Sequence, residues 1–199
     1  MAHEGLWQQL DKLDHNTTAQ RAKCEYLADP PRYVISLLNT EYVVDLSDKQ
    51  IFPTQSSPPP TPAGFIEQLC LLAYLINAKE VPLANTYVKA ENLPSGQFFF
   101  RGLHSLPTKK LEEAFGKSPE LLYKASERFD GKKREFGDAS IEFYGLPRIP
   151  LQIVIWGSDE EFDARASILF DQTAGTHMPL DALGALANLA VEALIKAPE

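Results

Sequence analysis

Four carboxylates lie within five residues between two apolar stretches in the last third of the chain. Asp159, Glu160 and Glu161 are consecutive, and Asp163 follows after Phe162. Their mutual repulsion must be relieved by a divalent cation, an arginine, backbone N–H groups or water. The spacing differs from that of an EF-hand loop, so no metal site is predicted. Two interpretations of the acidic residues remain: a solvated hairpin tip and the rim of a binding site.

A second set of residues could carry acid–base chemistry. His177 follows Asp171 by six residues and precedes an apolar run. A carboxylate near an imidazole is a common general-base pair, and its convergence with the acidic loop would make a metal-assisted hydrolase or an acid–base enzyme. The alternative is a histidine at a helix entry that hydrogen-bonds local backbone. The chain has no G-x-G-x-x-G, H-E-x-x-H or C-x-x-C motif, and the sequence leaves open whether it is an enzyme.

The acidic residues are expected to close a hairpin. The apolar run 151–156 and the run 164–171 read as strands, and pairing Trp156 with Asp163 sorts their side chains by face. One face collects apolar residues: Leu151, Ile153, Ile155, Ala164, Ala166, Ile168 and Phe170. The other face collects Gln152, Val154, Trp156, Arg165 and Ser167. We predict that the first face belongs to the core.

The stretch 138–144 alternates in the same way and adds Ser140, Glu142 and Tyr144 to the polar face. A polar face with large aromatic residues is typical of a ligand pocket or of a solvated sheet surface. In the pocket hypothesis, arginines pair with acidic groups, aromatic residues stack and the loop forms the rim. The predicted ligand-binding residues are Glu142, Tyr144, Arg148, Trp156, Asp159, Glu160, Glu161 and Arg165.

Helices must cover the apolar face. Leu180, Leu183, Ala187, Ala190 and Leu194 form one stripe of a C-terminal helix. A central helix begins after the proline-rich stretch 53–62, which is predicted to be an internal connector. We therefore predict an α+β fold over residues 1–199, a single domain whose mainly antiparallel sheet is covered on one face by these two helices.

The remaining elements are predicted from local pattern. Residues 3–27 read as one helix, or as two with a kink near Asn16, and the runs 33–38 and 42–46 read as a hairpin. A third short strand is expected at 50–52 and another strand at 97–100. The basic triplet 132–134 reads as a solvated turn.

Composition excludes several classes of protein. A formal net charge of −8 over 199 residues argues against a nucleic-acid partner, because phosphate binding needs clustered cations. The longest apolar run, 69–76, is too short to cross a bilayer, and no export signal is visible, so we expect a cytoplasmic protein without a membrane partner. Cys24 and Cys70 have no metal-ligand spacing and are expected to be buried thiols.

Several motifs resemble those of a family of uncharacterised prokaryotic proteins of about 200 residues, found mainly in anaerobes. These are Leu71–Leu75, Leu93–Gly96, Phe115–Gly116, Pro147–Pro150, Trp156–Phe162 and Ile168–Asp171. Some relatives carry an N-terminal iron–sulfur segment that is absent here, so the redox role of that segment does not transfer. The resemblance implies an accessory role in cofactor handling, without naming the cofactor.

The leading functional hypothesis is an accessory protein that binds a small cofactor or a partner protein with the face around Trp156 and the acidic loop. The metal-assisted or acid–base enzyme is one alternative. A structural protein or homodimer that uses the exposed aromatic residues is another.

Overall fold

The computed structural model describes residues 3–55 and 60–196, and these residues form two antiparallel sheets. The strands of the first sheet are hydrogen-bonded in sequence order: β1 (Glu25–Ala28), β2 (Pro31–Leu37), β3 (Thr40–Asp45) and β4 (Gln50–Pro53). The second sheet has the order β5 (Tyr87–Lys89), β9 (Arg165–Asp171), β8 (Ile149–Trp156), β7 (Ala139–Leu146) and β6 (Lys132–Arg134). The predicted α+β class is confirmed, with two sheets where the sequence indicated one.

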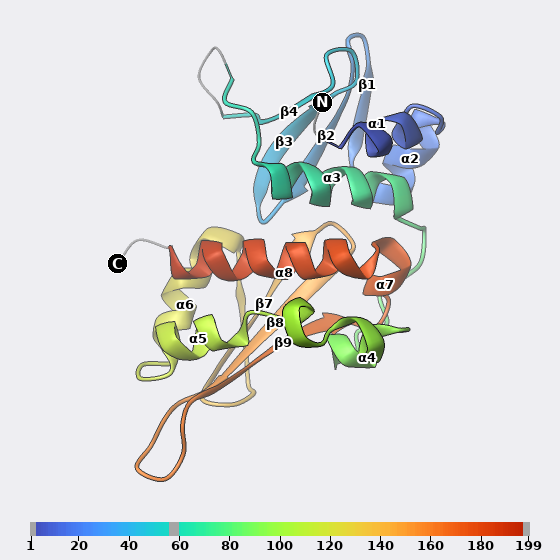
Figure 1. The fold of residues 1–199 in the computed structure, drawn as a ribbon. Helices are drawn as coiled ribbons and strands as arrows, with labels where there is room; N and C mark the ends of the chain where they lie inside the picture. The colour runs from blue at the N-terminus through green and yellow to red at the C-terminus, as the bar shows by residue number, and fades with distance from the viewer. Residues whose placement is uncertain (1–2, 56–59, 197–199) are drawn as a thin grey trace.

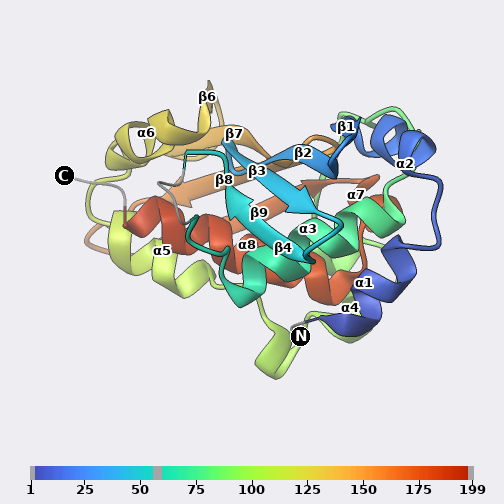
Figure 2. The same ribbon diagram turned by 90° about the horizontal axis from the view of Figure 1, so that it is seen from above.

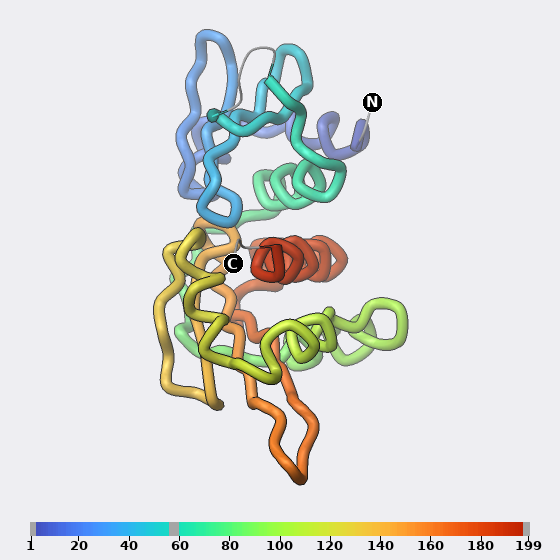
Figure 3. The backbone as a smooth tube through the Cα atoms, turned by 90° about the vertical axis from the view of Figure 1, so that its left-hand side faces the viewer, coloured from blue at the N-terminus to red at the C-terminus, as the bar shows by residue number. Residues whose placement is uncertain are grey.

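Most of the helices lie on one side of the two sheets (Figures 1 and 3). They are α1 (Glu4–Leu10), α2 (His15–Ala22), α3 (Phe65–Asn77), α4 (Gly96–Phe99), α5 (Thr108–Phe115), α6 (Leu121–Ser126), α7 (Ala174–His177) and α8 (Leu180–Ile195). Three-residue 3₁₀ turns span Ala90–Asn92, Gly102–His104 and Glu127–Phe129.

The central helix α3 and the C-terminal helix α8 pack side by side, on the same side of the two sheets (Figures 1 and 3). The predicted stripe of α8 is buried at Leu183, Ala187, Ala190 and Leu194, and the middle of α3 is buried from Leu71 to Leu75. Such apolar stripes are stable only when another element covers them. The two helices therefore form the shared core of the molecule.

The two sheets meet near the ends of β2 and β7 (Figure 2). The turn after β2 donates the Leu38 N–H to the Gly145 carbonyl at 2.9 Å, and the Asn39 side chain donates to the Arg128 carbonyl at 3.1 Å. Gly145 lies where the register of β7 and β8 shifts, between Tyr144 and Leu146. This bulge leaves its carbonyl free of the ladder and available to the neighbouring sheet.

The N-terminal region differs from the predicted long helix. Asp14 accepts a hydrogen bond from the Thr17 N–H at 2.8 Å and so starts a second helix after α1. Lys23 then adopts a left-handed conformation that ends α2, and the chain continues into β1. The break predicted near Asn16 is confirmed, but β1 was missed because its four residues carry no clear alternation.

Two short segments contradict the local pattern. Residues 97–100 were predicted to form a strand, but Gly96–Phe99 form α4, with Phe100 buried and Phe98 75% exposed. The basic triplet 132–134 was predicted to be a turn, but it is the edge strand β6, paired with β7. Edge strands commonly carry charged residues because only one side is hydrogen-bonded.

The β8–β9 hairpin forms with the predicted faces but another register. Trp156 lies opposite Arg165, two residues beyond the predicted partner Asp163. A shift of two residues leaves every side chain on its predicted face, because the side-chain period of a strand is two. Ile153, Ile155 and Phe170 therefore lie in the core, whereas Trp156 is 42% exposed on the outer face.

The proline-rich connector predicted at 53–62 is only partly described. Pro53 ends β4, residues 60–64 form no helix or strand, and residues 56–59 lie outside the described residues. In residues 3–55 and 60–196 no helix has the length and apolar character needed to span a bilayer.

Candidate functional site

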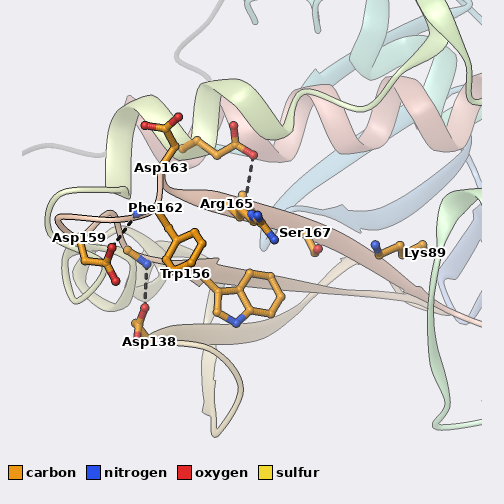
Figure 4. Close-up of a pocket in the computed structure, with 11 residues that line it drawn as sticks. Lys89, Asp138, Trp156, Asp159, Phe162, Asp163, Arg165 and Ser167 are labelled. Carbon is orange, nitrogen blue, oxygen red and sulfur yellow. Dashed lines mark hydrogen bonds between the residues drawn. The ribbon is translucent and has the colours of Figure 1, made fainter.

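An open cavity of about 670 Å³ lies beside the β8–β9 hairpin, and we call it the Trp156 groove (Figure 4). It is lined by residues of the hairpin, of β5 and of α5: Lys89, Glu112, Asp138, Trp156, Asp159, Phe162, Asp163, Arg165 and Ser167. In Figure 4 the side chains run from Asp159 and Phe162 on the loop, past Trp156 and Arg165, to Lys89. The groove thus combines two aromatic rings with groups of both charges.

Three of the carboxylates along the Trp156 groove already hold backbone N–H groups. Asp138 accepts from Gly157 at 2.7 Å, and Glu112 accepts from Ala166 at 3.1 Å (Figure 4). Asp159 accepts from the N–H groups of Glu161 and Phe162, at 2.8 and 2.7 Å. These hydrogen bonds hold the pKa of Asp159 below its ordinary value. The three acids therefore shape the loop and the strand edge.

The two cations of the groove are differently placed. Among the described residues, neither Lys89 nor Arg165 forms an ion pair. Arg165 lies directly opposite Trp156, so their side chains emerge about 5 Å apart. Arg165 is therefore available to an acidic group next to the exposed indole, whereas Lys89 lies further along the groove, opposite Leu169.

The acidic loop is a turn at the hairpin tip. Besides Asp159, its members Glu160, Glu161 and Asp163 are exposed. In the described part of the chain no three His, Cys, Asp or Glu residues come close enough to hold a metal ion. Backbone N–H groups hold Asp159, and the side chains of the other three carboxylates are exposed. Of the four loop carboxylates, Asp159 and Asp163 line the groove.

The predicted ligand-binding residues do not all come together. Tyr144 is on the outer face, 45% exposed, but it pairs with Pro150 at the far end of β8 from Trp156. Six residues of strand separate the two rings by about 20 Å, so they do not stack on one small ligand. Glu142 lies between them, in an ion pair with Arg134 at 2.9 Å.

Arg148 lies away from the outer face. It is 7% exposed in the turn between β7 and β8, where its Nε donates to the Arg21 carbonyl at 2.6 Å and its Nη1 to the Val81 carbonyl at 3.3 Å. This guanidinium therefore ties α2 and the segment after α3 to the five-stranded sheet. The structure does not bring it near Trp156.

Asp171 and His177 are fully buried at the opposite end of β9 from the acidic loop. Burial alone would raise the pKa of Asp171, but hydrogen bonds from Thr173 and Ala84 outweigh it and hold the pKa below its ordinary value. Burial and then the charge of Arg148 lower the pKa of His177. The length of β9, about 20 Å, keeps this pair apart from the loop carboxylates.

Both buried groups keep one polar atom without a partner. His177 Nδ1 accepts from the Lys79 N–H at 3.3 Å, whereas its Nε2 and Asp171 Oδ2 have no hydrogen-bond partner among the described residues. The charges of Arg148 and Asp171 act in opposite directions on the pKa of His177: Arg148 lowers it and Asp171 raises it. The predicted acid–base pair is thus close in space but enclosed.

Burial keeps both cysteines protonated at neutral pH. Cys70 is buried and Cys24 is half-buried, and burial raises the pKa of each thiol to about 12.

Sequence reasoning missed Lys89 and Tyr87 because β5 is a strand of three residues inside a stretch without alternation. It missed Arg134 because the basic triplet reads as a turn. The available signal was the alternation of 132–134, which places Lys132 and Arg134 on one side of β6.

The chain was compared with curated proteins, solved structures and models of protein families. No curated protein and no solved structure matches it. One family model, described as a domain of unknown function (DUF3786), matches residues 14–193, from α2 into the last turns of α8. Because this match spans both sheets and nearly the whole sequence, the chain belongs to the DUF3786 family.

Proposed function

We propose that this protein binds a small organic anion with a planar ring in the Trp156 groove. The indole of Trp156 supplies a stacking surface, and the acidic group of the ligand pairs with Arg165 and Lys89. Charge-assisted hydrogen bonds of this kind are about twice as strong as neutral ones. The function is therefore that of a binding or accessory protein.

One observation carries the proposal. The groove holds an exposed aromatic ring beside two cations that have no ion-pair partner among the described residues, while three of its carboxylates are engaged by backbone N–H groups. An unpaired arginine beside the exposed indole, with an unpaired lysine further along the groove, favours an anionic aromatic ligand.

The enzyme alternative receives no such support, because Asp171 and His177 are enclosed and lie a strand length from the acidic loop. The homodimer alternative uses the same exposed aromatic rings, and the native-mass measurement below distinguishes it from ligand binding. The resemblance noted above adds a prokaryotic, mainly anaerobic setting and a role in cofactor handling, and composition adds a cytoplasmic location. These expectations, and the single domain over 1–199, stay predictions.

The test uses 8-anilinonaphthalene-1-sulfonate, a fluorescent dye with planar rings and one acidic group. Arg165→Gln should weaken dye binding about tenfold, and Trp156→Ala should weaken it as well, because each removes one of the two contacts. Arg101→Gln and Phe98→Ser change an exposed cation and an exposed ring elsewhere and serve as matched controls. Equal affinities for the Trp156 and Arg165 variants and the wild type would overturn the proposal.

A second measurement needs no added ligand. The native mass of the purified protein is compared with its denatured mass. Excess mass near one chain that disappears in the Arg165→Gln variant supports a retained anionic ligand. A native mass of two chains that reverts to one in the Trp156→Ala variant supports the homodimer instead.

A further inference from the structure

A second hollow of about 610 Å³ lies on the outer face of the five-stranded sheet and shares Trp156 with the Trp156 groove. Its floor is apolar, formed by Val154 of β8 and Leu169 of β9. Phe136, 57% exposed, forms another wall. A flat apolar floor between two aromatic walls suits a planar ring.

The polar groups around this hollow are held in place. Arg134 and Glu142 form a two-point ion pair, Nη2 to Oε1 at 2.9 Å and Nε to Oε2 at 3.0 Å. Burial, and then the nearby Glu142 carboxylate, raise the pKa of Tyr87. The phenol therefore stays protonated at neutral pH, and it lies beside both the Glu142 carboxylate and the hollow.

Gln152 supplies a group that can both donate and accept. Its residue is only 3% exposed, yet none of the hydrogen bonds among the described residues uses its amide, and it lines the hollow. The buried polar atoms without a partner do not include this amide, so it reaches the surface of the hollow, where a ligand or water can satisfy it. Gln152 and Tyr87 thus present a mixed donor and acceptor edge above an apolar floor.

We propose that this hollow is a subsite for a planar nitrogen heterocycle whose phosphate or carboxylate substituent reaches Arg165 in the Trp156 groove. The inference rests on the proposed function and names its ligand class. Trp156 is the one lining residue that the two hollows share, and the proposed ligand spans them by passing this ring. The heterocycle edge meets Gln152 and Tyr87, and its acidic end meets Arg165 and Lys89.

The test measures binding of AMP, GMP and FMN by calorimetry, each beside its phosphate-free counterpart, adenosine, guanosine or riboflavin. At least one phosphorylated compound should bind the wild type. Gln152→Leu and Tyr87→Phe should each weaken that binding about tenfold by removing a hydrogen bond. Tyr144→Phe changes an exposed phenol on the same face outside this hollow and should have no effect.

The outcomes separate the two proposals. If no compound of the panel binds, or if the Gln152 and Tyr87 variants bind as tightly as the wild type, the heterocycle subsite is overturned. If those variants have no effect while Arg165→Gln still weakens dye binding, only the subsite falls and the proposed function stands. If Arg165→Gln changes neither dye nor nucleotide binding, the proposed function falls. Tyr87→Phe keeps the aromatic ring and its packing. This variant therefore tests the subsite even if Gln152→Leu does not fold.

Discussion

Trp156 and Trp7 are the two tryptophans of the chain, and their environments are opposite. Trp156 is 42% exposed beside the groove, and Trp7 is 1% exposed beneath the four-stranded sheet. The Trp7→Phe protein should therefore show strong quenching of its fluorescence by acrylamide, and the Trp156→Phe protein weak quenching. Steady-state quenching measures this difference. Similar quenching of both proteins would mean that Trp156 is covered in solution, as a homodimer would require.

His177 links the buried cluster to pH. It faces Arg148, Asp171, Lys79 and Lys23, and burial with the Arg148 charge lowers its pKa from the ordinary value of 6.5. The unfolded chain therefore binds more protons than the folded chain just below pH 6.5. Stability from this group is complete above pH 6.5 and is lost as the pH falls through the lowered pKa.

Denaturant unfolding between pH 7 and pH 5 measures this dependence. The wild type should lose stability across the interval, and His177→Gln should lose less, because glutamine does not titrate. His104→Gln changes an exposed histidine and serves as the control. An identical pH dependence for the His177 variant and the wild type would contradict the assignment.

At the scale of elements, α4 depends on a close approach at its first residue. A Cβ at Gly96 would lie 2.0 Å from the Ala90 carbonyl oxygen, so a larger residue must displace the backbone. Gly96→Ala should lower the free energy of unfolding by about 1–3 kcal/mol, as overpacking usually does. Thermal or urea unfolding of the purified variant measures the loss.

Gly5 provides the matched control for this change. It lies in α1, and no atom would come within 4 Å of an added Cβ. Gly5→Ala should be neutral or raise the free energy of unfolding by up to about 1 kcal/mol, because alanine favours the helix. Equal effects at both positions would show that α4 does not pack as described.

At the scale of the whole molecule, helices α3 and α8 join the two sheets. The Cys70 sulfur lies 3.9 Å from the Ala182 carbonyl oxygen, and backbone and side-chain hydrogen bonds connect Leu38 with Gly145 and Arg148 with Arg21. Separating the sheets would expose the apolar faces of both helices, at about 1.5–3 kcal/mol for each large side chain. We therefore predict one cooperative unfolding transition.

The single-tryptophan proteins test this, because Trp7 lies under the Lys49 ammonium of the turn between β3 and β4, whereas Trp156 lies on the second sheet. In urea, the unfolding curve of each protein followed by fluorescence should coincide with its own curve followed by far-ultraviolet circular dichroism. Separate midpoints within one protein would show that the two sheets unfold independently, and would contradict the predicted single domain.

The sequence alone determined which side chains face the core. Strand alternation placed Ile153 and Ile155 inward and Trp156 outward, and helical periodicity identified the buried stripe of α8. These properties survive errors of register, because the two-residue shift at Arg165 leaves the faces unchanged. The sequence also determined the acidic loop, because its four carboxylates are adjacent in the chain.

Only the tertiary structure decided which residues share a site. Lys89, Tyr87 and Arg134 reach the two hollows from three-residue edge strands that exist because neighbouring strands hold them. Arg148 lies outside the predicted site because its guanidinium donates to carbonyl groups that are distant in the sequence. Local pattern fixes the direction of a side chain, but its partners depend on long-range strand pairing, which leaves little trace in a single sequence.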